Sequence, residues 1–154
     1  MTAHTRLAKE IKEYSRLGAA SDVLLQVDES NILLWRAFVK GPADTPFEGG
    51  TFELALNVPE HYPLQPPSVR FRTKVFHPNF HFKTGEICLD ILKHAWSPAW
   101  TLQAVCQAIV TLMGDAAPDS PLNCDAGNLL RANDWRGYNS LARMYTLELA
   151  MARK

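Results

Sequence analysis

The sequence lacks any excess of charge and any long apolar run. Its 154 residues include 16 Lys and Arg and 16 Asp and Glu, so the formal net charge is zero. Tight binding to nucleic acid through overall charge is therefore not expected, because such binding depends on neutralising phosphates. No apolar stretch approaches the roughly 20 residues of a membrane-spanning helix. The N-terminal sequence lacks the apolar core of a secretory signal, and the C-terminal sequence ELAMARK carries no lipidation motif.

Cysteine is also scarce, with three residues at positions 88, 106 and 124. An odd number of cysteines without an export signal indicates reduced thiols in a cytoplasmic compartment. The sequence shows no repeats, low-complexity tracts or linker-like stretches. We therefore expect a single globular domain that spans residues 1–154.

The hydrophobic pattern predicts the α+β class, because helices and strands are segregated along the chain. Apolar residues at helical spacing indicate an N-terminal helix over residues 5–17. Four strands are predicted to follow, at residues 23–27, 32–39, 51–58 and 69–72. The second of these segments is apolar on both faces, which favours an inner strand. We expect an antiparallel meander whose outer face carries Thr51, Glu53, Arg70 and Arg72.

The last third of the chain is predicted to be helical. Thr101 suits the N-cap of a helix over residues 102–113, and Gly114 suits its end. A shorter helix is predicted over residues 123–132, and Asp134 is expected to cap a final helix. The side chains that this final helix should turn inward are Trp135, Tyr138, Leu141, Ala142, Tyr145 and Leu149.

Residues 73–100 show little periodicity yet contain many large apolar side chains. A long irregular segment in a small domain is usually functional or disordered. The apolar side chains argue against disorder, so we expect the segment to be pinned to the core and to hold a site. These side chains are Phe76, Phe80, Phe82, Ile87, Trp96 and Trp100.

Cys88 lies in this segment and is a candidate nucleophile. Its context is a turn at Gly85-Glu86 and a polar amide, Asn79, on the preceding arm of the loop. The competing interpretation is a buried structural thiol, since free cysteine is among the most buried residue types. Cys106 lies beside the apolar stripe of its helix and is expected in the core. Cys124 begins a helix, where the dipole favours a thiolate, but nothing nearby suggests a role.

Two other kinds of site are compatible with the composition of this segment. Its metal-ligating side chains are His77, His81, Cys88 and His94. The gaps of four, seven and six residues between them match no common zinc spacing, so no metal is expected. A cysteine-protease pair needs a histidine near the thiol, and His77 and His94 leave that alternative open. No histidine–acid pair is obviously arranged as a base, which suits a cysteine that carries an acyl group.

The chain resembles the ubiquitin-conjugating enzymes over nearly its whole length. The matching segments are GPADTPFEGGTFEL, EHYPLQPPSVRF, HPN at 77–79, GEICLDIL at 85–92, WSPAWT at 96–101 and PDSPLN at 118–123. The resemblance implies this family's fold, an ATP-dependent conjugation pathway, and Cys88 as the acceptor of the C-terminal glycine of ubiquitin. No cofactor is implied. A thioester keeps the acyl group activated, and its thiol departs readily when an amine attacks, so no strong base is required.

The same resemblance assigns roles around Cys88. The Asn79 amide would stabilise the oxyanion of the tetrahedral intermediate, hold the loop in shape, or do both. Ser120 occupies the position that gates the site, where a serine is a weaker electrostatic aid than an aspartate. Asp119 beside it either compensates or acts only as a charge at a helix N-terminus. Asp90 is expected to be a solvated loop carboxylate.

The resemblance also implies partner surfaces. The basic face of the first helix, formed by Arg6, Lys9 and Lys12, would dock an acidic domain of the ubiquitin-activating enzyme. The alternative interpretation is a solvated face whose charges pair with Glu10 and Glu13. Ligases of the RING type would contact Leu64 and the turn Ser97-Pro98-Ala99. The outer face of the sheet is a third surface, for ubiquitin, a dedicated partner or nothing. A cis peptide bond is expected near Tyr62-Pro63.

Within the family, the segment LNCDAGNLLRANDW at 122–135 resembles the peroxisomal members. Those members are tethered by a membrane partner and act on import receptors, which would place this chain at the cytosolic face of the peroxisomal membrane. Two alternative functions are compatible with the same fold. One is an enzyme for another ubiquitin-like modifier, and the other is a non-catalytic ubiquitin-binding variant, which Cys88 and the HPN motif argue against.

Overall fold

The computed structural model describes residues 2–17 and 22–151 and confirms the predicted α+β class. The expected domain of 1–154 also includes Met1, 18–21 and 152–154, which lie outside the described residues. In chain order the elements are α1 (Ala3–Leu17), β1 (Val23–Val27), β2 (Leu34–Lys40), β3 (Thr51–Asn57), β4 (Ser68–Phe71), the 3-10 helix η1 (Asp90–Leu92), α2 (Leu102–Gly114), α3 (Cys124–Arg131) and α4 (Trp135–Leu149).

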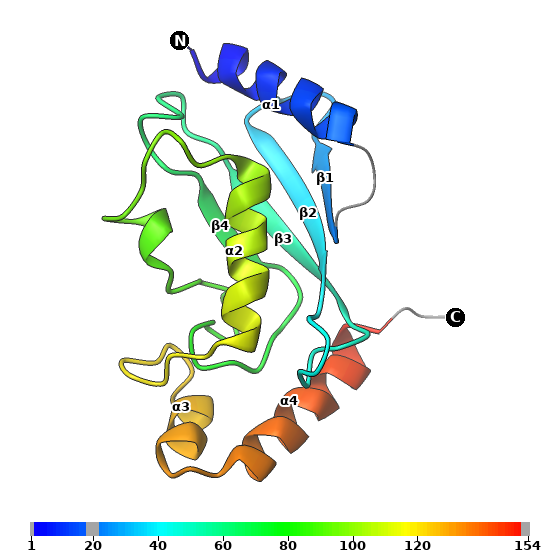
Figure 1. Ribbon diagram of the computed structural model, residues 1–154, viewed down its shortest axis with the longest axis vertical. Coiled ribbons are helices and arrows are strands. Elements are labelled where there is room, and N and C mark those ends of the chain that lie inside the picture. The colour runs from blue at the N-terminus through cyan, green and yellow to red at the C-terminus, as the bar shows by residue number, and fades with distance from the viewer. Residues whose placement is uncertain (1, 18–21, 152–154) are drawn as a thin grey trace.

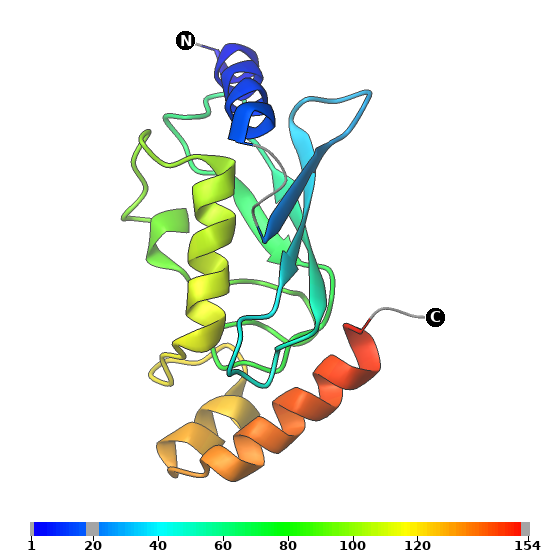
Figure 2. The same ribbon diagram turned by 45° about the vertical axis from the view of Figure 1, so that its right-hand side comes forward.

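The four strands form an antiparallel sheet in the order β1-β2-β3-β4, which is the predicted meander. The register places Trp35 opposite Leu56 and Leu54 opposite Phe71, so the buried side chains of neighbouring strands share one face. Helix α2 covers this face, α1 crosses one end of the sheet, and α3 and α4 lie at the opposite end (Figures 1 and 2). The buried apolar residues of the sheet and of α2 form a common core cluster.

Strand β2 is an inner strand, as predicted, but it is buried on one face only. Trp35, Ala37 and Val39 are buried, whereas Leu34 and Arg36 on the other face are exposed. An apolar residue on a strand therefore does not require a covering layer, because folded proteins leave much apolar surface in contact with water.

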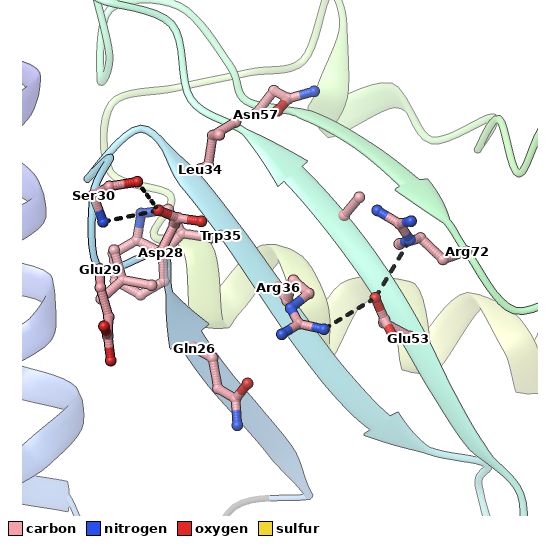
Figure 3. Close-up of a pocket in the computed structure, with 12 residues that line it drawn as sticks. Gln26, Asp28, Glu29, Ser30, Leu34, Trp35, Arg36, Glu53, Asn57 and Arg72 are labelled. Carbon is pink, nitrogen blue, oxygen red and sulfur yellow. Dashed lines mark hydrogen bonds and ion pairs between the residues drawn. The ribbon is translucent and has the colours of Figure 1, made fainter.

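The outer face of the sheet carries the polar side chains that its alternation predicts. Thr51, Arg70 and Arg72 are exposed and Glu53 is half-buried. The Glu53 carboxylate lies between two guanidinium groups, 3.4 Å from Arg72 and 3.9 Å from Arg36 (Figure 3). Exposed pairs of this kind contribute little to stability, so the arrangement is a property of the surface and not of the core.

The irregular segment 73–100 is pinned to the core, as expected. Phe76, Phe80 and Ile87 are buried, and isolated bridges join Phe80 to Ile87 and Arg70 to Glu86. The remaining aromatic side chains expected here, Phe82, Trp96 and Trp100, are half-buried against the same core.

Gly85 makes the tight turn in this segment possible. Its φ is +79°, and a Cβ at this position would lie 1.9 Å from the carbonyl oxygen of Phe71. Only glycine fits both the backbone conformation and the close approach. The turn leads to Cys88, which is exposed three residues further along the chain.

The helix caps agree with the sequence prediction. The Thr101 hydroxyl accepts from the Ala104 N–H at 3.1 Å, and the Asp134 carboxylate accepts from the Gly137 N–H at 2.9 Å. The short helix begins at Cys124 because Asn123 is its N-cap, accepting from the Ala126 N–H at 3.1 Å. The Tyr62-Pro63 bond is cis, as expected. No helix in the described part of the chain combines the length and the apolarity needed to cross a membrane.

The prediction for the inward face of α4 is only partly right. Tyr138 and Ala142 are buried and Tyr145 is half-buried. Trp135, Leu141 and Leu149 are exposed, so their predicted burial is wrong. Thr146 and Ala150 are buried in their place.

The reason is the contact that α4 makes with the loop before β3. The Thr51 N–H donates to the Ala150 carbonyl at 2.8 Å. A Cβ on Gly50 would lie 2.9 Å from the Thr146 methyl group. This close approach leaves room only for small side chains, such as those of Thr146 and Ala150, at the C-terminal end of the helix.

Candidate active site

Cys88 is exposed, so its interpretation as a buried structural thiol is wrong. It directly follows the bridge between Phe80 and Ile87, and its backbone N–H donates to the Asn79 carbonyl at 2.9 Å. The backbone of the cysteine is therefore fixed while its sulfur meets solvent. Cys106 is buried, as predicted, and burial raises the pKa of its thiol to about 12. Cys124 is exposed at the start of α3.

His77 is a buried structural histidine. Its Nδ1 accepts from the Asn79 N–H at 3.0 Å, so Nε2 carries the hydrogen and donates to the Leu112 carbonyl at 2.8 Å. Burial lowers the pKa of His77 to about 4, and the ring is neutral near pH 7. Both ring nitrogens are engaged, so His77 is available neither as a base for Cys88 nor as a metal ligand.

The other histidines of the segment do not complete a catalytic or metal site. Nδ1 of His81 accepts from the backbone N–H groups of Lys83 and Thr84 and so shapes the turn before Gly85. His94 is exposed beyond η1, and no hydrogen bond joins it to Cys88 in the described residues. Within residues 2–17 and 22–151, no group of three or more His, Cys, Asp or Glu side chains is placed to hold a metal ion.

The Asn79 side chain clasps a second loop. Its amide nitrogen donates to the Ala117 carbonyl at 2.8 Å, and its amide oxygen accepts from the Ala117 N–H at 2.9 Å. The side chain is almost fully buried in this arrangement. Of the two expected roles of Asn79, these hydrogen bonds correspond to the structural one, because they hold the loop that contains Ala117. The amide nitrogen carries a second hydrogen that these contacts do not use.

The loop that Asn79 clasps leads to Asp119 and Ser120. The Pro78 carbonyl fastens its far end by accepting from the N–H groups of Leu122, at 2.8 Å, and Asn123, at 3.2 Å. Between these two attachments Asp119 and Ser120 are both exposed. The structure thus brings the predicted gate residues to a loop held on both sides by the HPN segment.

Ser120 adopts a backbone conformation that is unusual for a serine. Its φ is +56°, in the left-handed region, which costs a non-glycine residue about 1–2 kcal/mol. Asp119 lies outside the first turn of α3, which begins at Cys124, so its interpretation as a helix N-terminal charge is not supported. Asp90 is exposed at the start of η1, as expected of a solvated carboxylate.

Comparisons with known proteins agree with this geometry. The family model for the ubiquitin-conjugating enzyme matches residues 6–146. The chain belongs to the ubiquitin-conjugating enzyme family. Members of this family are transferases that act through a cysteine thioester.

The chain is similar to named relatives along almost its whole length. It is 63% identical to Protein PEROXIN-4 of Arabidopsis thaliana, over 99% of this chain and 98% of the relative. It is 56% identical to the ubiquitin-conjugating enzyme E2 pex4 of Dictyostelium discoideum, over 92% of this chain and 95% of the relative. The H. polymorpha ubiquitin conjugating enzyme Pex4p, solved in complex with the soluble domain of Pex22p, superimposes with a TM-score of 0.91. That structure is 35% identical and covers 97% of this chain and 98% of its own.

Leu64 and the turn Ser97-Pro98-Ala99 lie on neighbouring loops. Leu64 is 76% exposed, and Pro98 and Ala99 are exposed. The indole N–H of Trp96 donates to the Pro63 carbonyl at 2.8 Å, which ties the two loops together. The residues expected to contact a ligase therefore belong to one surface.

The basic face of α1 is less uniform than the sequence suggests. Lys9 and Lys12 are exposed, and neither forms an ion pair within the described ranges 2–17 and 22–151. Arg6 is not a free surface charge, because it donates to Glu10 at 3.0 Å and to the Trp100 carbonyl at 2.9 Å. Glu13 pairs with Arg16 instead of with the predicted basic face.

Sequence reasoning missed two parts of this site. The backbone of Ala117 holds Asn79, but a backbone partner leaves no mark in the sequence. Glu10 and Tyr62 lie far apart along the chain, and the Tyr62 hydroxyl donates a hydrogen bond to the Glu10 carboxylate. The spacing of helical residues gave no signal for that contact.

We predict that Asn79→Ala lowers the free energy of unfolding by about 1–3 kcal/mol, because two hydrogen bonds of the clasp are lost. Denaturant unfolding of the purified protein measures the change. Asn139→Ala, at an exposed position of α4, is the matched control and should leave stability nearly unchanged. Equal stability of Asn79→Ala and wild type would refute the clasp as a source of stability.

Proposed function

We propose that Cys88 accepts the C-terminal carboxyl group of ubiquitin as a thioester and then transfers it to an acceptor. The observation that supports this proposal most directly is that Cys88 is exposed while the HPN segment holds its backbone in place. In loading, the Cys88 thiolate attacks the carbonyl carbon of the ubiquitin thioester on the activating enzyme, whose thiol leaves. In transfer, the acceptor amine attacks the same carbon, the Cys88 thiolate leaves, and the amine proton passes to solvent.

The surrounding residues suit a transfer that needs no strong base. Asn79 stabilises the oxyanion through the amide hydrogen that its clasp does not use, while the clasp itself fixes the position of that group. Ser120 and Asp119 border the approach to Cys88 on the clasped loop. Asp119 carries a negative charge that Ser120 lacks. This charge attracts the ammonium group of an approaching lysine.

The first test is thioester formation. Incubation of the protein with activating enzyme, ATP and ubiquitin should give an adduct one ubiquitin heavier that a thiol reductant removes. Cys88→Ser should give a reductant-resistant ester, and Cys88→Ala should give no adduct. Cys124→Ser, at the other exposed cysteine, is the control that should load like wild type.

The same assay decides between modifiers. Repeating it with other ubiquitin-like modifiers and their activating enzymes separates a ubiquitin enzyme from an enzyme for another modifier. Loading of a different modifier, with none of ubiquitin, would contradict the proposal. A wild-type protein that loads nothing would exclude the catalytic function altogether.

We propose further that RING-type ligases bind the surface formed by Leu64, Ser97, Pro98 and Ala99. The support is a highly exposed leucine on one loop and an exposed turn on the next, joined by the Trp96 hydrogen bond. Exposed apolar side chains that are held rigidly are suited to serve as binding anchors. Lys9 and Lys12 on α1 are proposed to meet the activating enzyme, with Arg6 contributing from its half-buried position.

Leu64→Asp should strongly reduce the acceleration of ubiquitin discharge by a RING domain that stimulates wild type, because a carboxylate replaces the apolar anchor. Discharge rates with and without the RING domain measure the effect. Leu24→Asp is the matched control, since Leu24 is also an exposed leucine but lies on the edge strand β1. Equal stimulation of Leu64→Asp and wild type would show that the ligase binds elsewhere.

We also propose that the chain, as one domain over residues 1–154, works at the cytosolic face of the peroxisomal membrane on import receptors. The support is its high identity to Protein PEROXIN-4 and to E2 pex4. The H. polymorpha Pex4p was solved with the soluble domain of Pex22p, and we propose that a membrane protein of that kind tethers this chain.

Expression of this chain in Arabidopsis thaliana that lacks PEROXIN-4 should restore import of peroxisomal matrix proteins. Import of a fluorescent matrix reporter measures the effect, and Cys88→Ala at matched expression is the control that should not restore it. Failure of the wild-type chain, despite thioester formation in vitro, would contradict the peroxisomal role and leave the conjugating activity intact.

A further inference from the structure

Glu10 on α1 forms hydrogen bonds with three separate parts of the chain. Its carboxylate accepts from Nε of Arg6 at 3.0 Å, from the backbone N–H of Leu102 at 2.8 Å, and from the hydroxyl of Tyr62. The side chain is only 11% exposed. One carboxylate thus joins α1 to the loop around Tyr62 and to the first residue of α2.

The partners of Glu10 strengthen the same junction. Arg6 uses its second nitrogen to donate to the Trp100 carbonyl, and its guanidinium lies 5.7 Å from the centre of the Tyr62 ring. Burial, together with the adjacent Glu10 carboxylate, raises the pKa of Tyr62, so its hydroxyl remains a donor. Hydrogen bonds to a charged carboxylate in a partly buried position are stronger than those between neutral groups.

Apolar packing of α1 is confined to a few side chains: Ala3 and Leu7 lie in the core and Ile11 packs against it. Although the helix has 15 residues, only Ala3 and Leu7 among them are buried. Near its C-terminal end, the Tyr14 hydroxyl contacts the backbone of Val23 and Leu25 on β1. The helix is therefore fastened to β1 near its C-terminal end, whereas its N-terminal half is held by the buried Leu7 and by the Glu10 cluster.

We infer that Glu10 is a positioning residue for loading: it sets the orientation of α1 relative to the segment 88–101, which carries Cys88. This inference rests on the proposed function, in which the activating enzyme docks on α1. That enzyme must hold α1 and receive the Cys88 sulfur at its own thioester at the same time. If α1 changes its orientation relative to Cys88, the activating enzyme can less often bind α1 and place its thioester at Cys88 at the same time. Loading then slows because the reacting groups are less often correctly oriented.

Transfer to a small free amine makes no such demand. Free lysine reaches the thioester without contacting α1, and the backbone of Cys88 is held by a different set of bonds, from the HPN segment and the Ala117 clasp. Loss of Glu10 should therefore weaken loading selectively.

The experiment measures two reactions of the same variants. Initial rates of loading by activating enzyme, ATP and ubiquitin are recorded against the concentration of the chain, to give KM and kcat. The purified thioester is then discharged onto free lysine. Glu10→Gln should raise KM for loading by about five- to tenfold, the scale of one ordinary hydrogen bond, with kcat and free-lysine discharge within about twofold of wild type.

Further variants separate positioning from a general loss of structure. Tyr62→Phe removes a single donor and should raise KM by a smaller factor, about two- to fourfold. The double variant should fall short of the product of the two factors, since both side chains belong to one cluster. Glu13→Gln is the matched control on the same helix, because Glu13 is more than half exposed and pairs only with Arg16 in the described residues.

Each outcome decides the inference. If the wild-type protein loads normally and Glu10→Gln has the same KM for loading, the inference is refuted. Equal losses in loading and in free-lysine discharge overturn it as well, because they indicate a general structural role. If Glu10→Gln does not fold, Tyr62→Phe decides by the same criteria. Absence of loading by the wild-type chain would instead refute the proposed function, a result that these variants do not produce.

Discussion

The site depends on a clasp between the Asn79 side chain and the Ala117 backbone, two positions that are 38 residues apart in the sequence. One amide group donates to the carbonyl and accepts from the N–H of the same residue, which fixes both distance and orientation. The Pro78 carbonyl adds a second attachment at Leu122 and Asn123. Together they hold the loop 117–123 against the HPN segment, and the same segment binds the backbone N–H of Cys88 through the Asn79 carbonyl.

The clasp in turn rests on a buried and neutral His77. Its two ring nitrogens connect the backbone of Asn79 to the carbonyl of Leu112 near the end of α2, and its ring stacks on Phe80 with centroids 4.3 Å apart. A charged imidazole would be unfavourable in this apolar position. The histidine that a protease would use as a base is here a structural support, which agrees with the proposed role of the Cys88 thiol as a carrier of an activated acyl group.

The architecture separates chemistry from recognition. The HPN segment and the clasped loop hold the surroundings of Cys88, whereas the Glu10 cluster and the Trp96 hydrogen bond organise α1 and the loops proposed to meet partners. The outer face of the sheet remains uncovered by any described element, although several of its residues are apolar. A small fold with one covered face thus offers several surfaces besides the one that exposes Cys88.

The elements, the caps at Thr101 and Asp134 and the inner position of β2 could be predicted from the sequence, as could Cys88 as the candidate nucleophile, because they follow from local periodicity, capping chemistry and ordered motifs. Only the tertiary structure decided which side of α4 is buried, that Arg6 is engaged within the protein, that Asn79 clasps Ala117, and that Glu10 meets Tyr62. The physical reason is that those features depend on contacts with backbone atoms and on residues distant along the chain. The hydrophobic pattern of the sequence shows which side chains are apolar, but it does not show which parts of the chain they will contact.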